Sequence, residues 1–335
     1  MDPPGFSNPG NINENYRQQN EGDRVAALSN KLKSGSQPGG RPLAAVEIAP
    51  EGALAAAVPA AGQPAQYAFA SLPAGALVPG IAEPNLRNAE AVAEALRSAL
   101  EQVAPRNRHV TVVIPDTAAR VFVLDFDSLP QKSIEAIPVL RFRLRKMVPF
   151  DVEHAAVSYQ ILAERDQDEK VGSIVKVLAT VMPGPVLAEY EAAVRAAGYE
   201  PGAVLPSSLA ALAALDSPHP VLAANLSGLA LTTAITSGDD LLLYRTVELP
   251  EDPAARVAEV QRSVAVAAAY FEDKLNAPPR EVHYAGAIDA REFSRAIADA
   301  QLTVLEVAPA SSAGTSSLGP IGYAGVMGAL SQFQS

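Results

Sequence analysis

Asp125 and Asp127, in the segment VLDFDSLP, form the most obvious pair of side chains that could do chemistry, as a general acid and a general base. They alternate along the chain with Leu124, Phe126 and Leu129. Such alternation is typical of a strand whose polar side chains all lie on one exposed face. We therefore interpret both carboxylates as surface groups and not as a catalytic pair.

Other catalytic motifs are missing from the sequence. No serine stands in a G-x-S-x-G elbow, and no glycine-rich run has the Walker A pattern. The chain has no cysteine, which rules out a thiol nucleophile, a disulfide and a cysteine-ligated metal. The histidines stand at positions 109, 154, 219 and 283, too far apart for metal-ligand spacing. We predict no catalytic residues and no metal site.

The composition describes an acidic, folded protein. Its 37 acidic and 26 basic side chains give a net charge of −11, which argues against nucleic acid as a partner because phosphate binding needs clustered cations. Apolar residues make up 48% of 335 residues, enough for about two domains with their own cores. No run approaches the roughly 18 apolar residues of a membrane span, and the N-terminus does not resemble a signal peptide. We expect a cytoplasmic protein.

Residues 1–41 differ from the rest of the chain. They are rich in Asn, Gln, Ser, Gly and Pro and poor in apolar residues, so they cannot bury enough surface to offset the entropy lost on ordering. We predict a flexible N-terminal tail. Within it, Val25, Leu28 and Leu32 recur at helical spacing, which indicates either a short docking helix or a transient helix in a linker.

A pattern of three strands, a helix and a further strand occurs twice. In the first copy, strands are predicted at 43–49, 53–58 and 65–71, a helix after Asn88, and the last strand at 109–115. In the second copy, three strand-like runs lie within 222–249, a long amphipathic helix follows, and EVHYAG is the last strand. Repetition of architecture without repetition of sequence predicts an α/β fold with two lobes built on mixed sheets.

Additional elements interrupt the first copy. Strand patterns at 119–126, 155–163 and 173–182, with a helical stretch near 132–147, predict a small inserted subdomain at about 116–182. The expected organisation has four parts, namely the tail at 1–41, a first lobe at 42–215 that contains the insert, a second lobe at 216–308, and a linker with a C-terminal helix at 309–335.

Two segments resemble the PilM proteins of type IV pilus assembly. Residues 146–162 (KMVPFDVEHAAVSYQIL) are similar to the family segment in which a helix ends at Pro-Phe before a strand that ends in Tyr-Gln. Residues 175–215 resemble the family's strand, helix, glycine turn, strand and serine-initiated helix. The resemblance covers roughly 42–330. It implies an actin-like (ribonuclease-H-like) fold of duplicated lobes, with the C-terminal helix packed on the first lobe.

The superfamily binds ATP between two β-hairpins and a glycine-rich turn, and the first hairpin is altered in this chain. The resemblance matches it to residues 47–53, where Glu47 keeps a carboxylate but Ala49 replaces a glycine. Pro50 lacks the N–H that a phosphate-binding loop would offer, and Glu51 adds negative charge. The hairpin has no lysine.

The second hairpin and the adenosine turn are altered as well. Asn225 stands where the family has an Mg²⁺-coordinating Asp, and an amide brings no charge to a hard cation. The other matched positions are Ser227, Gly228 and Gly286. Because ATP hydrolysis needs positioning and charge stabilisation from all three sites, we expect a pseudo-ATPase without ATP or Mg²⁺ as cofactor.

The resemblance also implies a partner. PilM-like proteins receive the N-terminal cytoplasmic peptide of a membrane-anchored protein, PilN, in a groove between the first lobe and the inserted subdomain. Peptides of this kind bind by strand pairing and side-chain pockets. By resemblance, the strands at 119–126 and 155–163 border the groove, so the candidate contacts are Val121, Val123, Phe150 and Tyr159. Ordinary core packing is the alternative for the two aromatic residues.

Basic residues cluster in the predicted helix of the insert. Arg141 and Arg145 lie one helical turn apart, next to Arg143 and Lys146, in an otherwise acidic protein. Two interpretations stay open. The cluster is either a solvated helix face with cations near its C-terminus or a contact for an acidic partner surface.

The function predicted from these features is that of a non-enzymatic scaffold in a type IV pilus machine. It would lie in the cytoplasm, peripheral to the inner membrane, and link a PilN-like peptide to the assembly motor ATPases. Its contact with the membrane would be indirect, and a homo-oligomer or ring is compatible with this role. The alternatives are a cytoplasmic component of a type II secretion system, a nucleotide-binding actin-like ATPase, and a self-assembling filament protein.

Overall fold

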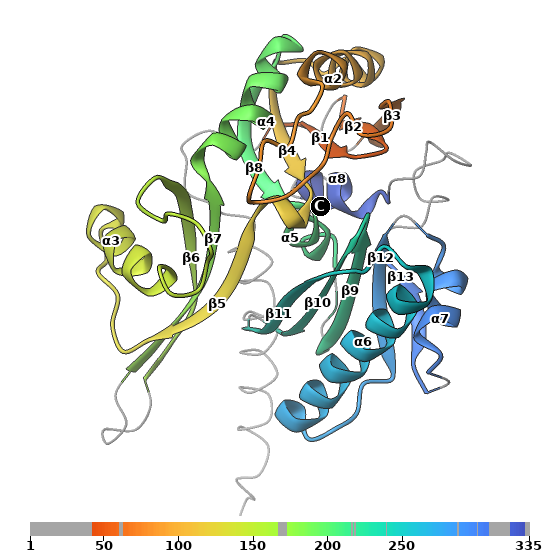
Figure 1. The fold of residues 1–335 in the computed structure, drawn as a ribbon. Helices are drawn as coiled ribbons and strands as arrows, with labels where there is room; N and C mark the ends of the chain where they lie inside the picture. The colour runs from red at the N-terminus through yellow and green to blue at the C-terminus, as the bar shows by residue number, and fades with distance from the viewer. Residues whose placement is uncertain are drawn as a thin grey trace, which may run out of the picture.

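The computed structural model describes residues 42–59, 63–166, 173–215, 217, 219–238, 240–286, 288–299, 301–307 and 322–331. The predicted tail at 1–41 lies outside these residues, as do residues 309–321 of the predicted linker and C-terminal helix at 309–335. The described chain forms two five-stranded sheets and one three-stranded sheet (Figure 1). None of the described helices is both long enough and apolar enough to span a membrane.

The first sheet has the strand order β3-β2-β1-β4-β8. Its strands are β1 (Ala44–Ala49), β2 (Gly52–Ala57), β3 (Gln66–Ser71), β4 (His109–Ile114) and β8 (Glu200–Pro206). The first three are antiparallel, whereas β4 is parallel to β1 and β8 is parallel to β4. Every residue of β1 and β2 is buried, as expected for a sheet whose two faces are both covered.

Helices cover the two faces of the first sheet. One face packs against α2 (Ala89–Val103) and α4 (Gly184–Ala196), and the other against α5 (Ser207–Leu212) and α8 (Ala324–Leu330). The predicted cap of α2 is confirmed, because the Asn88 side chain accepts a hydrogen bond from the Ala91 N–H at 3.0 Å. Gly198, with φ +89°, takes the left-handed conformation in the turn after α4.

The second sheet repeats the first. Its order is β11-β10-β9-β12-β13, and its antiparallel and parallel pairings match those of the first sheet strand by strand. The strands are β9 (Val221–Ser227), β10 (Ala230–Ser237), β11 (Asp240–Glu248), β12 (Glu281–Gly286) and β13 (Thr303–Glu306). α6 (Pro253–Leu275) and α7 (Ala290–Ile297) cover one face. The predicted duplicated architecture is therefore confirmed.

The third sheet is inserted between β4 and α4. It has the antiparallel order β5-β7-β6, formed by β5 (Arg120–Phe126), β6 (Ala155–Asp166) and β7 (Ser173–Pro183). α3 (Ser133–Leu144) packs on one face of this sheet, and the other face meets β10 and β11 of the second sheet. A short 3-10 turn, η1 (Asp116–Ala118), connects β4 to this insert.

Candidate functional site

A pocket of about 330 Å³ opens where the hairpins of the two five-stranded sheets meet. The β1–β2 hairpin, the β9–β10 hairpin and the end of β12 all contribute to its lining. Six of the seven cleft positions predicted from the sequence line it, namely Glu47, Ala49, Asn225, Ser227, Gly228 and Gly286. The seventh, Pro50, lies in the turn of the first hairpin but not in the lining.

The turn chemistry of both hairpins explains their shape. Ala49 pairs with Gly52, so Pro50 and Glu51 form a two-residue turn. In the second hairpin Ser227 pairs with Ala230, and Gly228 adopts φ +55°, which glycine tolerates without steric cost. Two tight turns of this kind bring the ends of β1 and β9 to the same pocket.

A network of buried polar side chains lies beneath the pocket and connects the two lobes. Ser207 donates from its hydroxyl to Glu47 Oε1 at 2.6 Å, and Asn225 donates from Nδ2 to the Ser208 hydroxyl oxygen at 2.9 Å. Asp116 Oδ1 accepts from the Ser208 N–H at 3.0 Å, and its Oδ2 accepts from the Ser208 hydroxyl at 2.5 Å. The network thus joins residues of β1, η1 and α5 to a residue of the second sheet.

Thr232 gives the network a second connection to the second sheet. Its hydroxyl donates to Asp116 Oδ2 at 3.4 Å and lies 2.8 Å from the Thr246 hydroxyl. Asp116, Ser208 and Thr232 are all buried. A polar cluster that is hydrogen-bonded in this way fixes the relative position of the groups that it connects, because an unpaired buried polar group is costly.

Sequence reasoning did not find Asp116, Ser207, Ser208 or Thr232. A usable signal was present for the first three. Asp116 follows β4 in the string HVTVVIPD, and the two serines follow β8 in the string AVLPSS. Because β4 and β8 are parallel neighbours, their carboxyl ends meet at one edge of the sheet, where polar side chains of α/β proteins tend to converge.

Burial dominates the electrostatics of the pocket. It raises the pKa of Glu47 to about 7, against the lowering effect of the hydrogen bond from Ser207, and the charges of Asp116 and Glu51 raise the pKa further. Burial also raises the pKa of Asp116, although its hydrogen bonds from Ser208 oppose this. Glu47 Oε2 is buried without a hydrogen-bond partner among the described residues. The pocket therefore shifts Glu47 toward its neutral form, compared with an exposed carboxyl group.

The C-terminal segment closes one side of the pocket. Gly322 lies so close to Gly286 that a Cβ at Gly322 would be 2.6 Å from the Gly286 carbonyl oxygen. A Cβ at Gly325 would be 2.3 Å from Glu47 Oε2, and one at Gly328 would be 1.8 Å from the Ala210 carbonyl oxygen. Only glycines allow α8 to approach the cleft and α5 so closely.

These residues do not fit Mg²⁺-ATP. The described lining of the pocket contains no Lys or Arg that could bind a polyphosphate, and the charge of Glu51 would repel one. Asn225 donates from Nδ2 to the two serine hydroxyls, and its amide brings no charge to Mg²⁺. Within the described ranges, no three His, Asp or Glu side chains converge as a metal site would require. The cleft thus offers neither the cations nor the ligand cluster that phosphoryl transfer needs.

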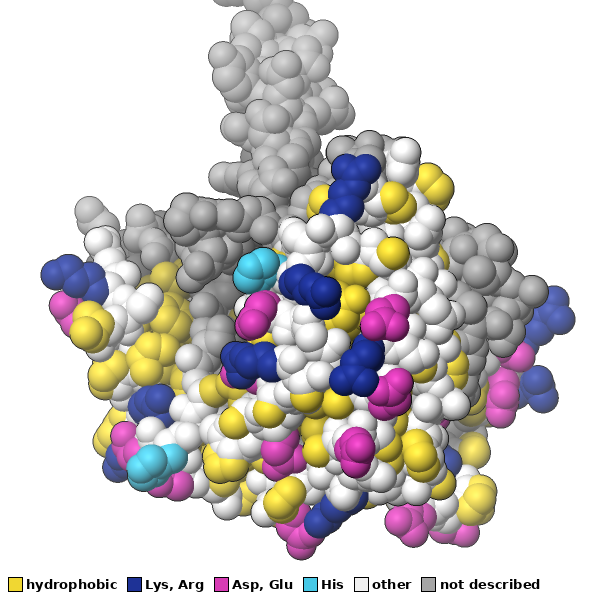
Figure 2. All heavy atoms as spheres, turned by 90° about the horizontal axis from the view of Figure 1, so that it is seen from above, with side chains coloured by type: hydrophobic (Ala, Val, Ile, Leu, Met, Phe, Trp, Pro, Cys, Tyr) yellow, Lys and Arg dark blue, Asp and Glu magenta, His cyan; other side chains and the backbone are white. Residues whose placement is uncertain are grey.

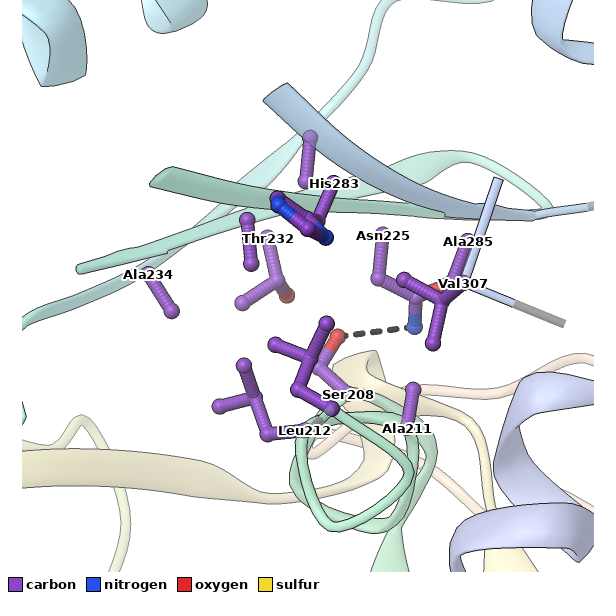
Figure 3. A pocket seen from close by; sticks show the side chains of 12 residues that line it. Ser208, Ala211, Leu212, Asn225, Thr232, Ala234, His283, Ala285 and Val307 are labelled. Carbon is purple, nitrogen blue, oxygen red and sulfur yellow. Dashed lines mark hydrogen bonds between the residues drawn. The ribbon is translucent and has the colours of Figure 1, made fainter. Parts of the chain in front are cut away.

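A second pocket, of about 260 Å³, lies next to the first between α5 and the face of the second sheet that α6 does not cover (Figure 3). Alanine and leucine side chains make up most of its lining. Asn225 and Ser208 face each other across it, as the dashed line in Figure 3 marks. His283 also lines it, and burial lowers the pKa of this imidazole. The pocket is part of the seam between the lobes and adds no nucleophile.

The four apolar residues predicted to contact a partner lie on opposite faces of the third sheet. Val121 and Val123 pack toward the second sheet, in a cluster with Tyr244. Phe150 and Tyr159 pack in the core beneath α3. Because the two pairs lie on opposite faces, the four side chains do not line one groove on a single face of the sheet.

The two arginines predicted to contact an acidic partner make local contacts. The Arg141 guanidinium donates to the carbonyl oxygens of Val152, Glu153 and Ala155 and so fastens the turn that precedes β6. Arg145 forms an ion pair with Glu153 at 2.5 Å, with both side chains largely exposed. The structure thus gives Arg141 a positioning role within the insert. Asp125 and Asp127, interpreted from the sequence as surface groups, are both exposed.

Comparison with known proteins identifies the fold. The sequence matches no family model and no curated protein. Among solved structures, the chain is similar to a chain of the PilM–PilN type IV pilus biogenesis complex, with a TM-score of 0.64 and 16% identity over 87% of this chain and 98% of that chain. The predicted actin-like fold with duplicated lobes is confirmed.

Weaker likenesses involve two other solved structures. The cytoplasmic domain of EpsL, an inner-membrane component of the type II secretion system of Vibrio cholerae, has a TM-score of 0.45 and 14% identity over 72% of this chain and 81% of that chain. A Bacteroides thetaiotaomicron protein with an actin-like ATPase fold and unknown function has a TM-score of 0.44 and 12% identity over 78% and 90% of the two chains.

The close packing of α8 predicts that Gly328→Ala destabilises the protein. A methyl group there would meet the Ala210 carbonyl, which is backbone and cannot rotate away, so we expect the free energy of unfolding to fall by about 1–3 kcal/mol. Urea denaturation measures this change. Gly80→Ala is the control, because nothing lies within 4 Å of its Cβ position. Equal stability of the two variants would contradict the packing described for α8.

The raised pKa of Glu47 predicts a pH dependence of stability. Between the unfolded pKa of 4.5 and the folded pKa of about 7, the folded state holds a proton that the unfolded state has lost. Stability therefore falls as the pH rises from 5 to 8, by on the order of 2 kcal/mol from this group. Asp116, whose pKa is also raised, adds a change in the same direction.

The Glu47→Gln variant isolates the Glu47 contribution. Because the amide does not titrate and Asp116 is unchanged, the variant should gain stability relative to the unmodified protein as the pH rises from 5 to 8. Urea denaturation at several pH values measures the difference, with exposed Glu101→Gln as the matched control. A stability difference that stays constant over this pH range would show that Glu47 is not held neutral by burial.

Proposed function

We propose that this chain is a non-enzymatic, actin-like scaffold of a type IV pilus machine. The observation that carries the proposal is a cleft of the actin-like fold whose described lining holds the buried Glu47, a second acidic residue, Glu51, and no Lys or Arg. The likeness to a chain of the PilM–PilN complex supports the choice of machine.

A scaffold needs lobes that keep a fixed relation to each other, and this chain supplies that relation itself. The hydrogen bonds from Asn225 to Ser208 and from Thr232 to Asp116 connect the lobes through protein groups alone. Gly322 against Gly286 adds a backbone contact at the same seam. A bound nucleotide is therefore not needed to join the two lobes.

The partner in this proposal is the N-terminal cytoplasmic peptide of a PilN-like membrane protein. Within the described residues, β6 pairs with β7 alone, so its other edge offers backbone groups to an added strand. β6 begins beside the first lobe, where the His154 carbonyl oxygen would lie 2.5 Å from a Cβ at Gly184. Tyr159, half-buried on β6, contacts the Ser133 hydroxyl at 3.4 Å and would form the wall of a side-chain pocket.

In this role the chain lies in the cytoplasm at the inner membrane and connects the membrane partner to the pilus assembly motors, as a single copy or as a ring. The related proposal, a component of a type II secretion system, uses the same fold and the same mode of peptide capture. The two differ in the partner peptide, so binding to peptides from each machine distinguishes them.

The composition of the cleft predicts that mant-ATP does not bind at micromolar concentration. Carboxylates face the space that phosphates would occupy, and Pro50 contributes no N–H to the hairpin turn. Titration of the full chain with mant-ATP, with and without Mg²⁺, should give no saturable change in fluorescence. Saturable binding that requires Mg²⁺ and is lost in Glu47→Gln would refute the pseudo-ATPase proposal and favour an ATPase.

The edge of β6 predicts which substitutions weaken peptide binding. Fluorescence anisotropy with labelled N-terminal peptides of candidate membrane partners measures the affinity. We expect Tyr159→Ala to weaken binding by about 5- to 30-fold, since truncating an aromatic contact costs roughly 1–2 kcal/mol. Val121→Ala is the matched control, because Val121 lies on the opposite face of the same sheet. If Val121→Ala alone weakens binding, the peptide lies instead at the seam between β5 and the second sheet.

A further inference from the structure

α3 carries apolar side chains on two opposite faces. Ala136, Leu140 and Leu144 are fully buried against the third sheet. On the outer face, the exposed fractions of Ile134 and Phe142 are 82% and 71%. Among the described residues, the large hydrophobic side chains that are exposed number nine, and four of them lie between 134 and 147, which makes this the densest such surface. Exposed apolar side chains concentrated in this way mark an interaction site.

The exposed apolar residues form a stripe along the helix. Ile134, Pro138 and Phe142 occur at every fourth position and are all exposed. They therefore follow one another along the same side of α3. Val139, 37% exposed, widens the stripe on one side, and Met147, 41% exposed, follows just after the helix. We call these five residues the outer stripe.

Cations accompany the outer stripe. The segment 132–147 carries Lys132, Arg141, Arg143, Arg145 and Lys146 against one carboxylate, Glu135, whereas the whole chain has a net charge of −11. Within the described part of the chain, Arg143 and Lys146 have no carboxylate within 4.0 Å, and both are exposed. A local positive charge on an acidic protein fits an anionic partner.

We propose that α3 is a membrane-contacting helix that rests on the surface of an anionic lipid bilayer. Its outer stripe would enter the boundary between headgroups and acyl chains, and Arg143 and Lys146 would contact the headgroup phosphates. Helices that lie in this interface combine an apolar face with flanking Lys and Arg, whose long stems keep the charge in the polar layer. The proposal differs from the indirect membrane contact expected from the sequence.

A lipid surface fits these residues better than the other anionic partners. Free phosphate would engage the cations but would leave Ile134 and Phe142 in water. An acidic protein surface would engage the cations, but it would have to carry an apolar patch of its own to cover Ile134 and Phe142. A bilayer uses both features at once, since it has an anionic layer above an apolar one.

The position of α3 suits contact with a flat surface. The helix covers the outer side of the third sheet, at the far left of Figure 1, whereas α6 and α7 cover the second sheet at the right. Seen from above, the side of the molecule that carries the third sheet shows apolar side chains together with basic and acidic ones (left in Figure 2). A bilayer against α3 would therefore leave the cleft between the lobes uncovered.

Vesicle co-sedimentation with the full chain tests the proposal. The probes are phosphatidylcholine vesicles with 30% phosphatidylglycerol and vesicles of phosphatidylcholine alone. We expect binding to the anionic vesicles only, reduced by 0.5 M salt. Ile134→Ser with Phe142→Ser should reduce the apparent affinity at least tenfold, and Arg143→Glu with Lys146→Glu should reduce it by at least 20-fold, since each cation near an anionic surface is worth roughly fivefold.

The matched control is Val257→Ser with Val266→Ser, which removes two exposed apolar side chains from α6, away from the insert. This variant should bind the vesicles like the unmodified protein. All substituted positions are exposed, and thermal unfolding verifies that each variant is folded. Absence of binding to anionic vesicles, or binding that both α3 variants retain, would refute the proposal. Peptide anisotropy on the same variants separates this outcome from failure of the scaffold proposal, because peptide binding at β6 does not require the outer stripe.

Discussion

Glu47 is buried between the two lobes, and the structure around the cleft depends on how that carboxyl group is accommodated. Burying an ionised carboxylate without a cation costs several kcal/mol, so the site must keep the group neutral or surround it with donors. Among the described residues, Ser207 donates to one oxygen of Glu47, and the other oxygen has no donor and lies against the backbone of Gly325. Neutralisation and tight covering by α8 thus take the place that a cation would have in a phosphate-binding cleft.

Because Glu47 is buried in this way, the cleft between the lobes and the inserted subdomain differ in what they can offer to a partner. The two five-stranded sheets end at the same cleft. The polar side chains of Asp116 and Asn225 are both hydrogen-bonded there to Ser208 of α5. Polar groups that are hydrogen-bonded to one another fix the position of the two lobes, but few of them remain available to bind a ligand. The inserted subdomain is different, because one edge of β6 lacks a ladder partner among the described residues and one face of α3 is apolar and exposed. The surfaces proposed to bind a partner therefore lie on the insert and not in the cleft.

Helices and strands that have a local sequence pattern could be predicted from the sequence. The helix after Asn88 and the runs that became β1 and β9 were found because capping and β-branched or alanine-rich runs act over a few residues. α7 and β13 were not predicted, since both are short and largely exposed. Asp116 and Ser208 meet only because β4 and β8 are neighbours, and this pairing joins segments about 90 residues apart. Val121 and Tyr159 lie on opposite faces because of the register in which β5 and β6 pair with β7, and no local pattern encodes that register.

The two surfaces proposed for the insert would reinforce each other. α3 and the edge of β6 belong to one small subdomain and are linked through Tyr159 and Ser133. A partner peptide anchored in the membrane is confined to the layer of cytoplasm next to the bilayer, and a helix that rests on the same bilayer confines this chain to that layer too. Binding at one surface then raises the effective concentration for binding at the other, so two weak contacts give one stable attachment. The cleft, which holds the lobes together, needs no part in this coupling.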